Sequence, residues 1–175
     1  MKKLILITLL STIATAPTFA ASGDTSVGSV VFSGFVPGFV SNGDIIITGA
    51  GGNTDLTAYT GSLLINADGT FSSSPIVLET HSYTSDTVGD LTEANWTVSQ
   101  VMIAPATMSE VQPNIVVGDR ISTKELTATE YLASEQLSGS HTIQLYVSNN
   151  TPHSNADDIA GSEVSVNVDL VATLP

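Results

Sequence analysis

Short apolar runs, separated by residues typical of turns, recur along the whole chain. The runs are Val30–Val36, Asp44–Thr48, Ser62–Ile65, Pro75–Glu79, Trp96–Ile103, Asn114–Val117, His141–Ser148 and Glu163–Val171. Between them, Asn42-Gly43, Gly49–Asn53 and Asn66–Gly69 supply residues that tolerate the positive φ angles of tight turns. This spacing predicts an all-β sandwich, in which Ser62–Ile65 and the segment from Phe71 onward form a hairpin.

Two of these runs alternate strictly between apolar and polar residues. In the first, Ile143, Leu145 and Val147 share one face of the predicted strand. In the second, the run near the end of the chain, the residues of one face are Val164, Val166, Val168 and Leu170. Alternation of this kind predicts strands with one face on a core and the other in water, in a firmly set register.

One segment departs from the β pattern. Thr127–Glu130 has the spacing of a helix capping box, and Tyr131, Leu132 and Leu137 can share a helix face before Gly139. The segment predicts a short helix of about ten residues, and an irregular crossover between strands is the alternative. Ser148–Asp158, rich in Asn, Ser and Asp, is predicted to be a polar surface loop.

The first twenty residues have the three parts of a secretion signal. Lys2 and Lys3 are followed by the apolar stretch Leu4–Leu10 and then by small residues ending at Ala20. We therefore expect cleavage between Ala20 and Ala21. The apolar run is shorter than the roughly 20 residues of a spanning helix, so a mature chain without membrane insertion, soluble and outside the cytoplasm, is expected.

Composition narrows the classes of partner. After cleavage, Arg120 and Lys124 are the two basic residues left against 17 acidic ones, which gives a net charge of −15. Such a charge repels phosphate backbones, so we expect no nucleic acid and no anionic lipid surface as a partner. The chain has no cysteine, which excludes thiol redox chemistry, disulfides and thiolate metal sites.

No combination of residues predicts catalysis, a cofactor or a metal. The histidines, His81, His141 and His153, have no metal-ligand spacing among them, and no Gly-x-Ser-x-Gly elbow is present. We interpret His141 as a surface or boundary residue and His153 as a solvated loop residue. Asp157-Asp158 near Asn155 allows weak calcium binding, and a solvated acidic loop is the favoured reading.

The two ends of the chain carry a family resemblance. Gly28, Val30, Phe32, Gly34 and Val36 are similar to the Gly-x-Val-x-Phe-x-Gly-x-Val stretch near the mature N-terminus of chaperone–usher fimbrial subunits. Gly161, followed by an alternating apolar strand, resembles the C-terminal end of those subunits. The chain departs from the family in two ways: the usual disulfide is missing, with Ser41 near the first cysteine position, and Leu174 replaces the penultimate tyrosine.

The resemblance implies an incomplete immunoglobulin-like β-sandwich that is completed by donor-strand complementation. Residues 1–20 are then the signal, residues 21–36 are the N-terminal extension with the donor strand, and residues 37–175 are the sandwich. An alternative assigns part of residues 21–36 to the first strand of the subunit's own fold. The donor face would be formed by Val30, Phe32, Gly34 and Val36. The edge of the acceptor groove would be formed by Val164, Val166, Val168 and Leu170.

The same resemblance implies partners and a location. The partners are identical or related fimbrial subunits, a periplasmic chaperone and an outer-membrane usher, and the subunit is exported through the periplasm into an extracellular, adhesive surface fimbria. No catalysis is involved.

Other readings stay open. One alternative is that the donated face uses the other register, which is formed by Val27, Ser29, Val31 and Phe35. Another is that both end segments are ordinary strands of a self-contained domain. The alternative function is a secreted carbohydrate- or surface-binding module, which needs an exposed aromatic platform around Trp96 or a calcium loop near Asp157. An extracellular hydrolase, the third reading, needs carboxylates clustered in a cleft.

Overall fold

The computed structural model describes residues 44–127 and 136–175. The chain divides into two units, Met1–Val36 and Pro37–Pro175, and every described residue belongs to the second. The described chain consists of antiparallel strands with little helix, so the all-β prediction is confirmed. Its only helices are short 3-10 segments, none of which has the length and apolar character of a transmembrane span.

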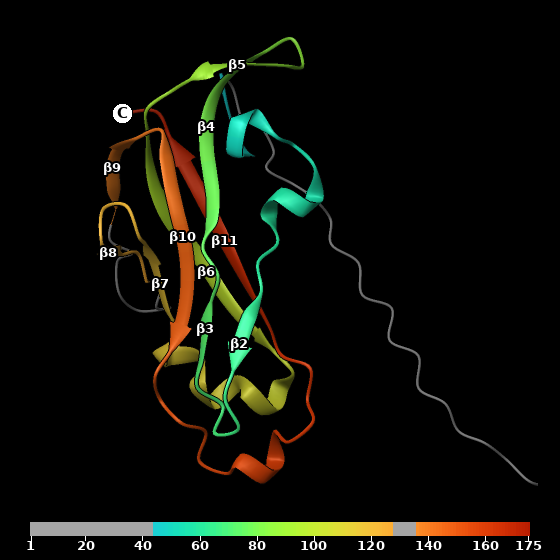
Figure 1. Ribbon diagram of the computed structural model, residues 1–175. Coiled ribbons are helices and arrows are strands. Elements are labelled where there is room, and N and C mark those ends of the chain that lie inside the picture. Colours follow the sequence, from blue (N-terminus) through green and yellow to red (C-terminus); the bar gives the residue numbers. More distant parts are fainter. Residues whose placement is uncertain (1–43, 128–135) are drawn as a thin grey trace, which may run out of the picture. The chain divides into compact units, whose positions relative to one another are not determined.

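Figure 1 shows the strands and the short 3-10 helices of the described chain. The strands are β1 (Ile45–Gly49), β2 (Leu63–Ile65), β3 (Phe71–Ser73), β4 (Ile76–Thr84), β5 (Thr87–Leu91), β6 (Ala94–Ala104), β7 (Val116–Asp119), β8 (Lys124–Glu125), β9 (Leu137–Ser140), β10 (Thr142–Asn149) and β11 (Ser165–Thr173). The 3-10 helices are η1 (Ala50–Gly52), η2 (Leu56–Tyr59), η3 (Ala106–Asn114) and η4 (Ala156–Asp158).

The described strands form two antiparallel sheets. In the larger sheet the order is β1-β4-β10-β3-β2, with β5 on β4, β7 on β10 and β8 on β7. In the smaller sheet the order is β11-β6-β9. Figure 1 shows β6 and β11 crossing behind β4 and β10, so that the two sheets form two layers.

The hydrophobic core takes side chains from both sheets. β10 contributes Ile143, Leu145 and Val147, which lie on its inward face, and β6 contributes Trp96 and Val98. η3 adds Met108 and Val111, both completely buried. The core is thus built by the alternation visible in the sequence, together with a 3-10 helix that the alternation did not predict.

A β-bulge keeps both halves of β6 in the core. Opposite β11, Gln100 pairs with Asp169 and Val98 with Leu170, so Ser99 is the extra residue. The buried positions change from Trp96 and Val98 to Val101 across the bulge. Because a strand has a period of two, inserting one residue is what allows both apolar groups to face inward.

Most of the predicted strands and turns are confirmed, with small shifts at their ends except in β4, which continues beyond the predicted Glu79 to Thr84. β2 and β3 pair as the predicted hairpin, and Gly51, Gly52 and Gly69 have the positive φ values expected of their turns. Val30–Val36 and Asn42-Gly43 lie outside the described residues. The sequence did not predict β5, β8 or β9, because these strands are short and lack a clear apolar alternation.

The helix predicted after Thr127 is contradicted at its end. Leu137 and Gly139 belong to β9, which pairs with β6 through Leu137 opposite Trp96 and Ser140 opposite Ala94. Residues 128–135, where the helix would begin, lie outside the described residues. Pairing with a long neighbouring strand outweighs the weak local helix signal here.

Candidate functional site

The candidate site is the outer edge of β11. This nine-residue strand pairs with β6 along its whole length, from Ser165 opposite Ala104 to Thr173 opposite Asn95. Among the residues that the structure describes, β6 is the only strand that pairs with it. Successive backbone groups of a strand point to opposite sides, so the edge away from β6 presents amide and carbonyl groups available to another strand.

The inward face of β11 is apolar but only partly buried. Val166, Val168, Leu170 and Ala172 pack against the core and keep intermediate exposure, while the residues between them are exposed. Val164 lies just before the strand begins and packs against the core in the same way. In the described chain, ten partly buried hydrophobic side chains contact the core, and five of them belong to this one segment.

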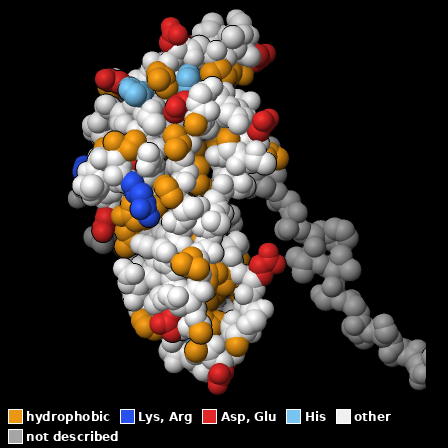
Figure 2. Space-filling model, viewed as in Figure 1, with side chains coloured by type: hydrophobic (Ala, Val, Ile, Leu, Met, Phe, Trp, Pro, Cys, Tyr) orange, Lys and Arg blue, Asp and Glu red, His pale blue; other side chains and the backbone are white. Residues whose placement is uncertain are grey.

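Partly covered apolar residues also occur on the larger sheet. Tyr59 of η2, Leu63 of β2 and Ile76 of β4 pack against the same core without being fully buried. Figure 2 shows hydrophobic side chains at the surface along the middle of this face of the molecule. The core therefore reaches the surface of the described chain along more than one element.

The edge of β11 lacks the features that usually protect a sheet edge. Asp169 is its one charged residue, and the strand contains neither lysine nor proline. The bulge lies on its partner β6, opposite Asp169 and Leu170, not on the outer edge. A long, weakly charged edge is a surface on which another strand can add.

Two sets of residues were predicted to bind other subunits, the donor face and the edge of the acceptor groove, and the described residues include only the second. The structure brings Val164, Val166, Val168 and Leu170 together on the inward side of one edge strand. The predicted donor residues Val30, Phe32, Gly34 and Val36 lie outside the described residues, as do Val27, Ser29, Val31 and Phe35 of the other register. The tyrosine-to-Leu174 departure falls after β11, where Leu174 is exposed.

The aromatic platform required by the carbohydrate-binding alternative is contradicted. Trp96 is completely buried, and its indole N–H donates to the Ser140 carbonyl over 2.7 Å. Its ring therefore fills the core beneath β9 and offers no face to a sugar. The sequence placed Trp96 in a strand but gave no sign of which face the ring would take, because the bulge changes the phase of β6.

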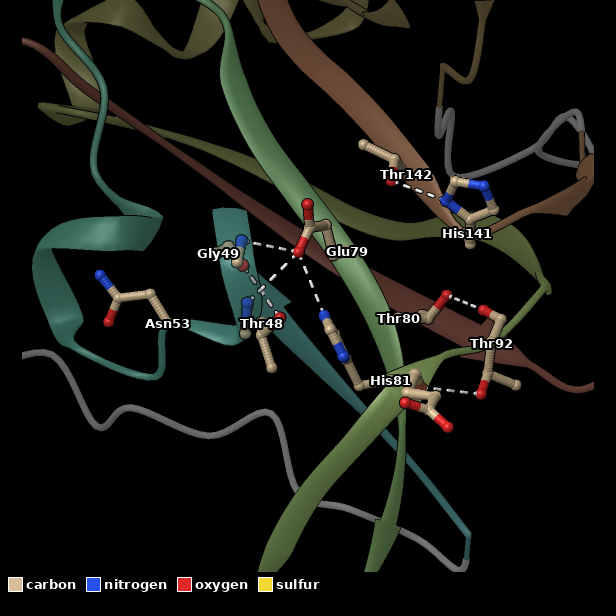
Figure 3. A network of polar contacts seen from close by, with 12 residues as sticks. Thr48, Gly49, Asn53, Glu79, Thr80, His81, Thr92, His141 and Thr142 are labelled. Carbon is tan, nitrogen blue, oxygen red and sulfur yellow. Dashed lines mark hydrogen bonds and ion pairs between the residues drawn. The ribbon is translucent and has the colours of Figure 1, made fainter.

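A polar cluster that the sequence analysis missed lies on the outer side of β4 (Figure 3). The Glu79 carboxylate accepts hydrogen bonds from the backbone N–H groups of Gly51 (2.8 Å) and Gly52 (3.3 Å), and lies 3.1 Å from His81 Nε2. The other ring nitrogen of His81 lies 2.8 Å from the Gly89 carbonyl. The one sequence signal was the Glu-x-His spacing, which puts both side chains on the same face of a strand.

This cluster has a structural explanation. Burial raises the pKa of Glu79, but the hydrogen bonds from His81, Gly52 and Gly51 outweigh burial, so the pKa is lowered overall. The ionised carboxylate joins η1 to β4, and His81 joins β4 to β5. Within residues 44–127 and 136–175, no three His, Asp or Glu side chains come together in a way that could hold a metal ion.

Asp119, at the end of β7, is a second carboxylate with a structural role, and it is buried. It accepts hydrogen bonds from the backbone N–H groups of Ser122 (2.7 Å), Gln144 (2.7 Å) and Ile121 (3.2 Å). Burial raises its pKa, but these bonds outweigh burial and lower the pKa overall. Asp119 therefore holds the β7–β8 turn against β10 as an anion.

The two remaining histidines differ from each other. His141 is exposed next to the start of β10, as predicted. His153 contradicts the prediction of a solvated loop residue, because its side chain is only 5% exposed.

Comparison of the chain with protein-family models, with curated proteins and with solved structures gave no match.

Proposed function

We propose that the chain is a structural subunit of a surface fimbria that polymerises by donor-strand exchange. The observation that carries the proposal is the long outer edge of β11, which has no strand partner in the described chain and stands beside a partly covered apolar face. The role is structural and requires no catalytic residue. In this proposal, the mature subunit lies outside the cell and supports adhesion.

The physical argument concerns what an added strand would supply. A segment in extended conformation would pair with the free amide and carbonyl groups of β11 and cover Val166, Val168 and Leu170. Each fully buried side chain of this size adds about 1.5 to 3 kcal/mol relative to its exposed state. Both gains favour occupancy of the edge by another chain over its exposure to water.

The proposed occupant is the N-terminal extension, residues 21–36, of the next subunit. Its segment Val30–Val36 is rich in Val and Phe, which favour strands, and has a typical strand length. The contact joins two different surfaces of the same chain. Such a contact does not close into a ring unless the rotation between copies allows it, and otherwise produces a filament.

The proposal also includes the route to the filament. A subunit with a free apolar edge is prone to aggregate before assembly. A periplasmic chaperone that lends a strand to β11, and an outer-membrane usher that exchanges this strand for the next subunit's extension, would protect the edge. In this proposal, the two sheets form an immunoglobulin-like sandwich that is incomplete until the edge of β11 is filled.

The test is strand addition in trans. A mature chain lacking residues 21–36 is melted alone and with a synthetic peptide of those residues. At a peptide concentration of about 100 times the dissociation constant, binding adds about 2.7 kcal/mol of stability. For a chain of this size, we expect the melting temperature to rise by about 10 °C.

Two matched peptides distinguish the registers. One carries Phe32→Asp and the other Phe35→Asp, so that the same change falls on opposite faces of the added strand. In the register of Val30, Phe32, Gly34 and Val36, only the first substitution abolishes the shift in melting temperature. A truncated chain that melts cooperatively and does not respond to the unmodified peptide would disprove the proposal.

A further inference from the structure

His153 lies at the meeting point of three segments at one end of the molecule. Its backbone N–H donates to the Asp68 carbonyl in the β2–β3 turn over 2.8 Å. Its ring nitrogen Nε2 lies 2.8 Å from the carbonyl of Thr107 in η3. The residue itself belongs to the loop that connects β10 to β11, so His153 links these three segments through its backbone N–H and its ring.

Packing leaves the ring little freedom to move. The side chain is only 5% exposed. Gly69 in the β2–β3 turn is so close that a Cβ atom there would lie 2.8 Å from Ile159 Cδ1 and 3.1 Å from His153 Cβ. Gly69 also has a φ of 84°, a value that side chains rarely adopt. The turn can therefore approach His153 only because residue 69 is glycine.

The protonated ring satisfies both of its carbonyl neighbours. Nδ1 lies 2.9 Å from the carbonyl of Asn155, while Nε2 faces Thr107. A neutral imidazole carries a single N–H and can donate to only one of these oxygens, whereas the imidazolium ion donates to both. Nδ1 can exchange one hydrogen-bond partner for another when it loses its proton, because the backbone N–H of Asn155 lies 3.2 Å from the same nitrogen.

The Asn155 carbonyl also begins η4. It accepts a hydrogen bond from the Asp158 N–H over 3.2 Å, and the Asn155 side chain accepts one from the Asp157 N–H. When Nδ1 is protonated, its N–H and the Asp158 N–H both donate hydrogen bonds to this carbonyl. When Nδ1 loses its proton, a lone pair faces the carbonyl oxygen, and the favourable partner becomes the Asn155 N–H.

The charged groups around the ring all favour the proton. Glu110 of η3 lies 3.8 Å from Nε2 and is itself held by the N–H and hydroxyl groups of Ser154. Asp158 of η4 adds further negative charge, while Asp68 of the β2–β3 turn directs its carboxylate to Thr70. The bond to Thr107 first, and then Asn155, Glu110 and Asp158, raise the pKa of His153 against the opposing effect of burial.

We propose that His153 is a proton-controlled clamp, which fixes the loop before β11 when protonated and releases it when neutral. The clamped loop runs through η4 and the buried Ile159 to Val164, the residue before β11. Loss of the Nδ1 proton replaces the ring's hydrogen bond to the Asn155 carbonyl with one from the Asn155 N–H, so the carbonyl at the start of η4 loses its link to the ring and η4 loosens against η3 and the β2–β3 turn. The clamp does not depend on donor-strand exchange, but in a fimbrial subunit it would control the start of the acceptor edge.

The direction of the pH dependence follows from the raised pKa. The stabilisation is complete below the ordinary histidine value of 6.5 and is lost as the pH rises through the higher pKa of the folded chain. The clamp is thus closed in mildly acidic surroundings and open in alkaline ones.

The test uses the complete mature chain and two readouts, between pH 5.5 and pH 9. The ring proton signals of His153 are followed by NMR, and we expect a titration midpoint above 6.5. Hydrogen exchange is followed at the amides of Ser154, Asp158 and Ile159. After correction for the intrinsic pH dependence of exchange, protection at these amides should fall about tenfold across the midpoint, whereas protection in β10 stays constant.

Three variants sharpen the test. Glu110→Gln should move the midpoint of His153 to lower pH, since it removes the nearest negative charge. His153→Gln should remove the pH dependence of loop protection, and His141→Gln, a change of the exposed histidine, should leave it as in the unaltered chain. A midpoint at or below 6.5, or the same loop profile in His153→Gln as in the unaltered chain, would overturn the proposal.

Discussion

Strands β10 and β11 have nearly the same pattern of residues and different surroundings. Each alternates apolar and polar positions along its length, and each directs its apolar residues to the common core. β10 has neighbours on both edges, with β4 and β3 on one side and β7 on the other. β11 has β6 alone within the described chain.

Burial follows the neighbours and not the pattern. Ile143, Leu145 and Val147 of β10 are 0%, 7% and 8% exposed, whereas the inward residues of β11 are all only partly buried. A sheet neighbour contributes its own inward side chains, which cover those of the strand beside it. Alternation therefore indicates which face of a strand is apolar but not whether the fold has covered that face.

The largest expected effect is in β10. We expect Ile143→Ala to lower the free energy of unfolding by about 2 to 5 kcal/mol, since it leaves a cavity in a fully buried site. Urea denaturation of the mature chain measures this loss. A loss below about 1 kcal/mol would mean that the core near β10 is loosely packed, and the comparison with β11 would fail.

The next effect is at Asp119, which ties β10 to the β7–β8 turn. Asp119→Asn should cost about 1 to 3 kcal/mol, because an NH₂ group then faces a backbone N–H donor. The pKa of Asp119 is lowered from 3.8, so its contribution is complete above this value and is lost as the pH falls through the folded pKa. The unaltered chain should therefore lose more stability than the variant between pH 5 and pH 2, as measured by urea midpoints.

A smaller effect is expected in β11. Val168→Ala should cost about 1 kcal/mol or less in the chain lacking residues 21–36, because the side chain is only partly buried. With a saturating peptide of those residues, the cost should roughly double, since an added strand would complete the burial. Equal losses for Val168→Ala and Ile143→Ala without peptide would show that β11 is already covered.

The smallest effect is the control on the opposite face of β11. Asn167 is exposed, so Asn167→Lys should change the stability of the same truncated chain by less than about 0.5 kcal/mol. Its peptide response should equal that of the unaltered chain, as measured by the shift in melting temperature. A reduced response would place the peptide on the outer face of the sheet and not along the edge.

Part of the fold could be predicted because its signals are local. The faces of β10 and β11 follow from alternation, and the β2–β3 hairpin follows from a turn sequence that ends in Gly69. Local signals did not reveal β5, β8 or β9, whose pairing depends on longer neighbours. Local signals also predicted a solvated side chain for His153, because its partners Thr107 and Asp68 are far away in the sequence.

The candidate site, like the fold, could be predicted only in part from the sequence. The apolar face at Val164, Val166, Val168 and Leu170 was visible in the sequence, because side-chain direction in a strand follows from position alone. The burial of Trp96 was not visible, since it depends on the bulge at Ser99 and on the cover provided by β9.

The β class, several turns and the apolar faces of β10 and β11 follow from the sequence alone, since these depend on neighbouring residues and a fixed period of two. Only the tertiary structure decided that β10 is enclosed while β11 lies at an edge, and that His153 is clamped between two carbonyl groups. Those outcomes depend on which distant segments come to lie side by side, and no local pattern carries that information.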